Sequence, residues 1–404
     1  MVRIRHFAGL LVAVVLTGCV TSSPTQPPAA ATPALPSLTA SPAPEATATA
    51  AQATTGLDAA SIRTVQLPPG MQAHRLSADG PRLVFDEIGY GDETGKLGTH
   101  IYLADLESQT MTTLTSTNNG DAAWVPDITS DAVAWSEWHR DDAGSIIWQV
   151  VVARLDTGAR TVIASGTNKR HEGSGAIPPL VQIHGDRVAY TVEDPTPERP
   201  GGWQVVVVSR STGVVLERYP TALSIYQMAL SGESVLYSEG LVDEQRSFKY
   251  ATRLMLASPQ AASGTLIAQD AFEVGFADGR LVWVSDPGSS EGQLGMAQHP
   301  QIATSRIDDL RVEILSDRPG FKAAFWPTTA DDAVAWSEDD GYSDGVGANR
   351  LAMWDVAHGV GIVADAHTPA PFLGGSGWLL WYDDSADGVN VVIHGAKVAD
   401  MVRP

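Results

Sequence analysis

One short sequence unit recurs seven times along this chain, at a period of roughly 50 residues. Each unit is an apolar run that ends in an aromatic residue, and an acidic residue follows two or three positions later. The aromatic residues are Phe85, Trp135, Tyr190, Tyr237, Trp283, Trp336 and Trp381. A repeat of this length predicts an array of equivalent structural units, and it argues against two or three unrelated domains in the 404 residues.

The units share one internal order of strand and turn signals. In the second unit a strand-like piece, 125–128, is followed by a tight turn at Ser130-Asp131 and then by the aromatic run. A variable polar loop leads to a third strand that begins near Trp148, and a further turn leads to a fourth. Four antiparallel strands per unit, repeated seven times without a sustained helical period, predict an all-β, seven-bladed β-propeller over residues 61–404. Separate small sheets or two stacked sandwiches would not explain the recurring order.

A propeller must close its ring. Residues 389–393 look like the third strand of the last unit, and residues 397–402 are one candidate for its fourth strand. Residues 62–67, placed before the first unit, look like another outer strand. We expect this N-terminal strand to complete or cover the last blade.

The N-terminal residues have the pattern of a signal peptide. Arg3 and Arg5 precede an apolar run, 7–16, which is too short to span a bilayer as a helix. The run ends in Leu16-Thr17-Gly18-Cys19, which resembles the lipobox of bacterial lipoprotein precursors. The resemblance implies that Cys19 receives a diacylglycerol, that residues 1–18 are cut off, and that the new amino terminus is acylated with a fatty acid such as palmitate. A buried cysteine in an ordinary signal helix is the alternative.

The implied address is extracytoplasmic, with the lipid anchor in the bacterial cell envelope. It is the outer face of the cell membrane, or the outer membrane if two membranes are present, because Val20 follows the cysteine where an inner-membrane retention signal has Asp. Residues 19–60 are rich in Pro, Ala, Thr and Ser and predict a disordered tether with a reach of roughly 35–40 Å. Cys19 is the only cysteine, so the chain cannot form an intramolecular disulfide.

The repeat resembles the WD40-like propeller repeat of TolB and related periplasmic proteins. That repeat has Ser-Pro-Asp-Gly, two further residues and an apolar–aromatic strand, and the best match here is the segment 77–85, from Ser77-Ala78-Asp79-Gly80 to Phe85. The other units match more loosely. The resemblance implies a propeller over residues 61–404. The tether stands where TolB has an α/β domain, so the envelope partnership of TolB is not carried over.

The net charge of the chain limits the kinds of partner that we expect it to bind. Lys and Arg number 26 against 47 Asp and Glu, a net charge of −21. Such a surface repels nucleic acid, so we expect no nucleic-acid partner. It suits a monomeric body, or one that meets cationic groups.

The acids that follow the aromatic residues form the most ordered candidate site. The second strands of all blades should end at one face, which predicts a negative ring around the channel mouth, suited to a cationic peptide, a polyamine or a metal ion. The alternative is that these acids prevent edge pairing and keep the face soluble. The seven residues are Glu87, Glu137, Glu193, Glu239, Asp286, Glu338 and Asp383.

Other candidate chemistry is weaker. Asp339, Asp340 and Asp344 lie in an acidic, Gly-containing loop that could coordinate Ca²⁺, although their spacing is not that of an EF-hand and a solvated loop is the alternative. No other cofactor is expected. The segment 139–142, His-Arg-Asp-Asp, is predicted to be a loop on the same face, where His139 could act as a base. We find no Gly-x-Ser-x-Gly, His-Glu-x-x-His or Walker sequence.

The tryptophans divide into two groups. Most occupy strand positions and are expected in the blade cores: Trp135, Trp148, Trp203, Trp283, Trp336 and Trp381. Trp138 and Trp326 lie outside that register and are candidates for exposure, although Trp124 and Trp326 could be equivalent turn-packing residues.

The function we expect from these features is that of a surface-anchored lipoprotein whose propeller binds or scaffolds a protein, peptide or glycan partner. One alternative is an extracytoplasmic hydrolase or lyase that uses carboxylates and His139 at the channel mouth. Another is a purely structural envelope component.

Overall fold

The computed structural model describes the propeller region with gaps. The described residues are 53–54, 56–57, 61–68, 71, 73–87, 100–116, 122–168, 178–195, 202–221, 223–242, 250–285, 300–316, 323–330, 333–339, 349–355, 359–365, 370–374, 377–384, 391–398 and 401–402. The predicted signal peptide, Cys19 and most of the predicted tether lie outside them. The described part contains no helix with the length and apolarity needed to cross a membrane.

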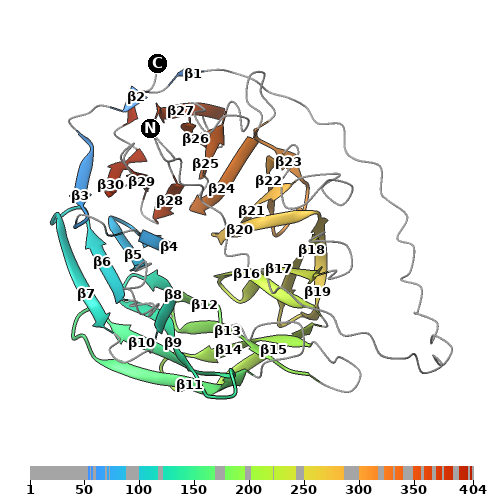
Figure 1. The fold of residues 1–404 in the computed structure, drawn as a ribbon. Coiled ribbons are helices and arrows are strands. Elements are labelled where there is room, and N and C mark those ends of the chain that lie inside the picture. Colours follow the sequence, from blue (N-terminus) through green and yellow to red (C-terminus); the bar gives the residue numbers. More distant parts are fainter. Residues whose placement is uncertain are drawn as a thin grey trace, which may run out of the picture. The chain divides into compact units, whose positions relative to one another are not determined.

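Seven antiparallel sheets, which we call blades 1 to 7, are arranged in a ring (Figure 1). Blade 1 consists of β4 (Ala73–Asp79), β5 (Arg82–Glu87), β6 (His100–Asp105) and β7 (Thr110–Ser116), and blade 2 of β8 (Ala122–Thr129), β9 (Ala132–Arg140), β10 (Ile146–Arg154) and β11 (Arg160–Asn168). Blade 3 consists of β12 (Val181–His184), β13 (Arg187–Glu193), β14 (Trp203–Ser209) and β15 (Val215–Thr221), and blade 4 of β16 (Ser224–Ser231), β17 (Ser234–Val242), β18 (Tyr250–Ser258) and β19 (Ala261–Gln269).

Blades 5 and 6 follow the same order, and blade 7 takes its outer strand from the N-terminal side of the chain. Blade 5 consists of β20 (Ala271–Ala277), β21 (Arg280–Ser285), β22 (Gln301–Arg306) and β23 (Glu313–Ile314), and blade 6 of β24 (Ala323–Ala330), β25 (Ala333–Asp339), β26 (Asn349–Asp355) and β27 (Gly359–Asp365). Blade 7 consists of β28 (Ala370–Gly374), β29 (Trp378–Asp384), β30 (Val391–Lys397) and β3 (Arg63–Gln66). Blade 6 gains a fifth strand, because β1 (Ala53–Thr54) pairs in parallel with β27. The predicted seven-bladed propeller of four-stranded antiparallel blades is confirmed.

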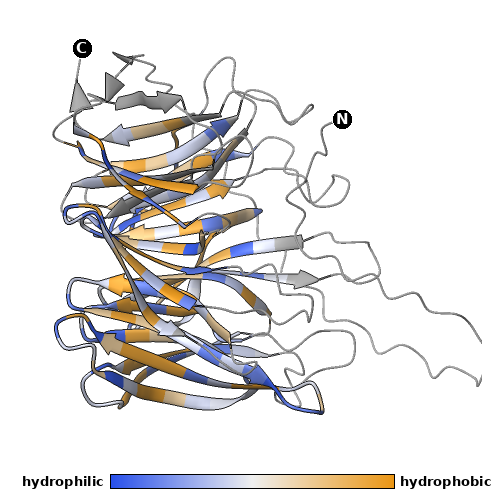
Figure 2. Ribbon diagram, turned by 60° about the vertical axis from the view of Figure 1, so that its left-hand side comes forward, coloured by the Kyte–Doolittle hydropathy of each residue, from blue (hydrophilic) through white to orange (hydrophobic). Residues whose placement is uncertain are grey.

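The hydrophobic core is divided into seven clusters, one between each pair of neighbouring blades. Alternation along the second strands produces this division, because successive side chains point to opposite faces of a sheet. In β9, Trp135 packs toward blade 1, whereas Ala134 packs toward blade 3. Figure 2 shows the hydrophobic stretches along the strands of the stacked blades.

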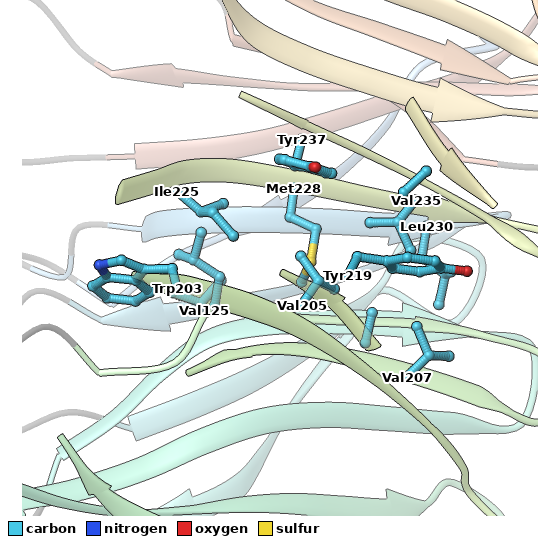
Figure 3. Close-up of a cluster of buried hydrophobic side chains, with 13 residues drawn as sticks. Val125, Trp203, Val205, Val207, Tyr219, Ile225, Met228, Leu230, Val235 and Tyr237 are labelled. Carbon is cyan, nitrogen blue, oxygen red and sulfur yellow. The ribbon is translucent and has the colours of Figure 1, made fainter. Parts of the chain in front are cut away.

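The interface between blades 3 and 4 illustrates the packing. Trp203 and Tyr219 of blade 3 meet Ile225 and Tyr237 of blade 4 (Figure 3). Burial of each large apolar side chain contributes roughly 1.5–3 kcal/mol, so the blades are held to one another by these clusters. The six tryptophans predicted in the blade cores are all buried: Trp135, Trp148, Trp203, Trp283, Trp336 and Trp381.

Tight turns join the first and second strands of blades 1 to 5. Ser130-Asp131, Gly185-Asp186 and Asp278-Gly279 occupy these turns as predicted, whereas the first turn is Gly80-Pro81, one residue later than expected. At Asp278 and Gly279 φ is positive, 49° and 75°, which is the geometry of two-residue hairpin turns. We call the side of the ring that carries these turns the turn face.

The N-terminal strand closes the ring, as predicted. β3 pairs antiparallel with β30 and becomes the outer strand of blade 7, beside β30 in Figure 1. Leu67, which follows β3, is 1% exposed and packs against blades 1 and 7. The other candidate for this position was wrong: β31 (Met401–Val402) pairs with β2 (Gly56–Leu57) in a separate two-stranded sheet.

We predict that Leu67→Ala lowers the free energy of unfolding by roughly 2–4 kcal/mol, because it leaves a cavity where β3 joins the first and last blades. Denaturant unfolding of the full chain measures this change. Thr64→Ala, an exposed position on the same strand, is the matched control and should change the free energy by less than about 0.5 kcal/mol. Equal effects of the two substitutions would contradict closure by β3.

Candidate functional site

Six of the seven predicted ring acids lie in strands, toward the ends of the second strands. Glu87 and Glu193 end β5 and β13, whereas Glu137, Glu239, Glu338 and Asp383 lie in β9, β17, β25 and β29. Asp286 lies outside the described residues, and the structure describes only the backbone of Asp383. All second strands run toward the same side of the ring, which we call the loop face. That the ring binds a ligand stays a prediction.

Glu137 and Glu338 accept hydrogen bonds from the aromatic residues that precede them. The indole nitrogen Nε1 of Trp135 donates to Oε1 of Glu137 at 3.0 Å, and Nε1 of Trp336 donates to Oε1 of Glu338 at 2.8 Å. Gln149 on the third strand of blade 2 donates to Oε2 of Glu137 at 2.7 Å. These carboxylates satisfy buried indole donors, which would otherwise lose their hydrogen bonds to water.

Glu87 and Glu239 likewise have protein partners: Glu87 and Arg253-bound Glu239 are held within their own blades, and Glu239 also contacts Thr221 of blade 3. The hydroxyl of Tyr102 donates to Oε2 of Glu87 at 3.1 Å, and burial, with a contribution from Glu87, raises the pKa of Tyr102 to about 12. Glu239 is 2% exposed; it accepts hydrogen bonds from the Thr221 hydroxyl and, at 2.5 Å, from Nη2 of Arg253. A ligand at these four carboxylates would have to compete with protein groups.

The structure changes one of the two weaker candidate sites, the segment 139–142, and does not describe most of the acidic loop. His139 and Arg140 belong to β9 rather than to a loop, which corrects the prediction; the loop begins at Asp141, whose Oδ1 accepts a hydrogen bond from the backbone N–H of Ser145 at 2.8 Å. The strand continues because His139 and Arg140 pair with residues of β10. Asp340 and Asp344, and the side chain of Asp339, lie outside the described part, which contains no group of three or more potential metal ligands.

The inner strands carry a recurring irregularity near the loop face. In β4, β8, β16, β20 and β24 the pairing with the second strand shifts register within the first half of the strand, as in a β-bulge. Four residues in these bulges have positive φ without being glycine: Arg75 at 43°, Val125 at 51°, and Glu273 and Trp326 at 52°. Such backbone is uncommon for any residue other than glycine, and it is most strained for β-branched or bulky ones.

A side chain of the preceding blade accepts a hydrogen bond from the backbone at three of these bulges. Val125 N–H donates to Oδ2 of Asp86 at 3.1 Å. Val274 N–H donates to Oε1 of Gln227 at 3.2 Å, and Trp326 N–H donates to Oε2 of Glu273 at 2.6 Å. We call these contacts the inter-blade bonds. They tie the inner strands of blades 2, 5 and 6 to the preceding blades, through the second strand β5 in blade 1 and the inner strands β16 and β20 in blades 4 and 5.

Blade 3 makes a similar contact with blade 2 without a bulge. The backbone N–H of Ile183 donates to Oδ2 of Asp127 at 2.7 Å, and the hydroxyl of Ser77 in blade 1 also donates to Asp127. Burial raises the pKa of Asp127 to about 6, although these hydrogen bonds oppose the shift. Burial likewise raises the pKa of Glu273 to about 7, against the hydrogen bond from Trp326.

Two tryptophans lie at these bulges. Trp326 is 42% exposed, and the inter-blade bond joins it to Glu273 in what we call the Glu273–Trp326 pair. In blades 1 and 2, the guanidinium carbon of Arg75 lies 5.0 Å from the ring centroid of Trp124, a cation–π contact. The prediction that Trp326 is exposed is confirmed, whereas Trp138 is only partly exposed and packs on the core between blades 2 and 3.

Sequence reasoning missed Arg75, Asp127 and Glu273, yet one signal pointed to the bulges. Val125-Pro126 and Trp326-Pro327 place a proline inside a predicted strand, and proline lacks the N–H that a regular ladder needs. Those two prolines mark bulges at equivalent positions of blades 2 and 6. Arg75 and Glu273 occupy the corresponding positions of blades 1 and 5 without a proline, so nothing local marked them.

Comparisons with known proteins give the fold. No protein-family description matches the chain, and no curated protein matches it. Similar solved structures include the β-propeller domain of the Trilobed protease from Pyrococcus furiosus, reported to have an open velcro topology, at TM-score 0.55 and 11% identity over 83% of this chain and 95% of that one. Oligogalacturonate lyase in complex with manganese gives TM-score 0.50 and 14% identity over 83% and 98%.

TolB from Acinetobacter baumannii is also among the similar structures, at TM-score 0.37 and 14% identity over 83% of this chain and 80% of that one. The two structures with TM-scores of 0.50 and 0.55 are only 14% and 11% identical to this chain, so their likeness extends to the propeller fold and not to an activity. Unlike the open ring named for the Trilobed protease domain, this ring is closed by β3.

We predict that the stability of the protein falls as pH rises from about 5 to 8, and that Glu273→Gln removes part of this fall. The folded state raises the pKa of Glu273 to about 7, so it holds the proton more tightly than the unfolded chain does. The resulting stabilisation is present at low pH and is lost as pH rises through 7. The free energy of unfolding, measured at pH 5 and pH 8 for both proteins, tests this; equal falls would contradict it.

Proposed function

We propose that this chain is a lipid-anchored, extracytoplasmic binding module whose propeller meets a protein, peptide or glycan partner at the loop face. Cys19 would carry the lipid, residues 19–60 would be the tether, and residues 61–404 would form the binding body. The anchor would lie in the cell envelope, with the propeller outside the cytoplasm.

The observation that carries the binding proposal is the contrast between the loop-face acids and the Glu273–Trp326 pair. Glu87, Glu137 and Glu239 are hydrogen-bonded within their blades, so they serve the fold. Trp326, by contrast, is 42% exposed although its backbone has a φ of 52°. A bulky side chain kept exposed in a costly conformation suggests a use outside the fold.

The anchoring proposal rests on the segment 16–19, Leu-Thr-Gly-Cys, after a short apolar run, and on the position of the only cysteine in that motif. A single acyl chain gives only marginal membrane binding, whereas two or more give stable anchoring. The diacylglycerol that the lipobox resemblance implies would therefore hold the protein at the membrane.

We predict that Cys19→Ser abolishes incorporation of labelled palmitate and moves the protein out of the membrane fraction, because serine offers no thiol for lipid transfer. Metabolic labelling followed by fractionation measures both effects. Ser22→Ala, just beyond the motif, should remain labelled and membrane-bound. Continued labelling of the Cys19→Ser protein would contradict the anchor.

A second prediction concerns the binding face. A photoreactive amino acid placed at Trp326 should crosslink the full-length protein to its partner on intact cells. The same photoreactive group placed at Thr212, an exposed residue in a turn on the turn face, should not crosslink to the partner. Gel shifts and mass spectrometry identify the products. Equal crosslinking from both positions, or crosslinking from Thr212 alone, would contradict binding at the loop face.

A further inference from the structure

Trp326 differs from the other tryptophans of the inner and second strands. Trp135, Trp283 and Trp336 are 0–1% exposed and fill the spaces between blades, whereas Trp326 is 42% exposed. Its φ is 52°, and its backbone N–H donates a hydrogen bond to Glu273 of the preceding blade. The chain therefore presents one indole to solvent from a fixed backbone position.

Glu273 holds the backbone of the residue that carries that indole. Its Oε2 accepts a hydrogen bond from the backbone nitrogen of Trp326 at 2.6 Å, so an acid of blade 5 is joined directly to the exposed tryptophan of blade 6. An indole face attracts a cation through its quadrupole, with a strength of roughly 0.5–2 kcal/mol. A neighbouring carboxylate adds a direct charge attraction.

Within the described strands packed against β20, the cationic side chains have partners other than this carboxyl group. Among the described strands packed against β20, the charged side chains are Glu239, Arg253 and Arg280, and Tyr226, Tyr237 and Tyr250 are the other titratable ones. Arg253 pairs with Glu239 at 2.5 Å. The guanidinium carbon of Arg280 lies 4.8 Å from the ring centroid of Trp354. β24 itself carries no charged residue.

We propose that the Glu273–Trp326 pair binds an alkylammonium group, of the kind carried by a polyamine or a lysine side chain. This inference rests on the proposed binding function and names its ligand chemistry. The net charge of −21 would raise the local concentration of cationic ligands and speed their approach. The indole would contact the methylene groups of the ligand and attract its ammonium charge. The carboxylate would form an ion pair with the ammonium group.

A proton and the ligand compete for Glu273. The pKa of Glu273 is raised to about 7 by burial, so near neutral pH part of the population carries an uncharged acid. The ammonium group favours the ionised form. Affinity therefore increases as pH rises from 6 to 8, over a range in which an alkylammonium group stays protonated.

The experiment measures binding to the full-length protein by calorimetry at pH 6 and pH 8. The probes are spermidine, a lysine-containing tripeptide, and the same tripeptide with its lysine and amino terminus acetylated. We expect spermidine or the unmodified tripeptide to bind more tightly at pH 8, and the acetylated peptide not to bind. Binding of spermidine alone assigns the site to a small polyamine; binding of the peptide alone assigns it to a lysine side chain; both results support the shared chemistry.

Three variants locate the site. Trp326→Gly removes the indole and leaves a residue that adopts positive φ without strain, and it should weaken binding by roughly tenfold. Trp326→Phe should retain most of the affinity. Glu273→Gln should weaken binding by roughly fivefold at pH 8 and abolish the pH dependence. Glu313→Gln, an exposed acid in the same blade, is the matched control and should bind like the unmodified protein.

Certain results overturn the inference: neither cationic probe binds, the acetylated peptide binds equally well, Trp326→Gly binds unchanged, or Glu313→Gln loses as much affinity as Glu273→Gln. If Trp326→Gly does not fold, the loss of pH dependence in Glu273→Gln decides the question. Crosslinking from position 326 to a cell-surface partner, together with failure of both cationic probes, would leave the proposed function standing and remove only the alkylammonium ligand.

Discussion

The loop-face half of this ring depends on a backbone N–H at three of the inner-strand bulges. The bulge directs that N–H to a side chain of the preceding blade. Asp86, Gln227 and Glu273 accept these bonds from Val125, Val274 and Trp326. A buried N–H without a partner costs roughly 1–3 kcal/mol. Each acceptor therefore stabilises the contact between its own blade and the following one.

Where the acid follows the aromatic residue by two positions, consecutive positions of the repeated unit have separate physical roles. The aromatic residue fills the space between blades, and in blades 1, 2 and 6 the residue after it is polar and buried: Asp86, Ser136 and Ser337. The acid that follows lies opposite an inner-strand residue near the start of that strand: Ala123 pairs with Glu137, and Ala324 with Glu338. The pattern combines core packing, support of the bulge and satisfaction of the aromatic donor.

Period and alternation were enough to predict the seven blades, the buried tryptophans and closure by the N-terminal strand, because these depend on patterns repeated along the chain. The candidate site was harder to predict from the sequence. The acids were visible in sequence, but their partners Gln149, Arg253 and Tyr102 come from other strands, and only three-dimensional pairing reveals them. The positive φ of Arg75 and Glu273 had no sequence signal, since neither residue type favours that conformation.

Closure by β3 also sets an order for folding. The side-chain amide of Gln66 donates to the carbonyl of Val391 at 3.2 Å, across a separation of 325 residues. During synthesis β3 emerges before every blade, yet its partner β30 appears only near the end of the chain. Contacts of such long range form slowly because a large loop must close first. For most of that time β3 is an unpaired strand, and the cluster of Val65 and Leu67 with blades 1 and 7 cannot form until the last blade has been made.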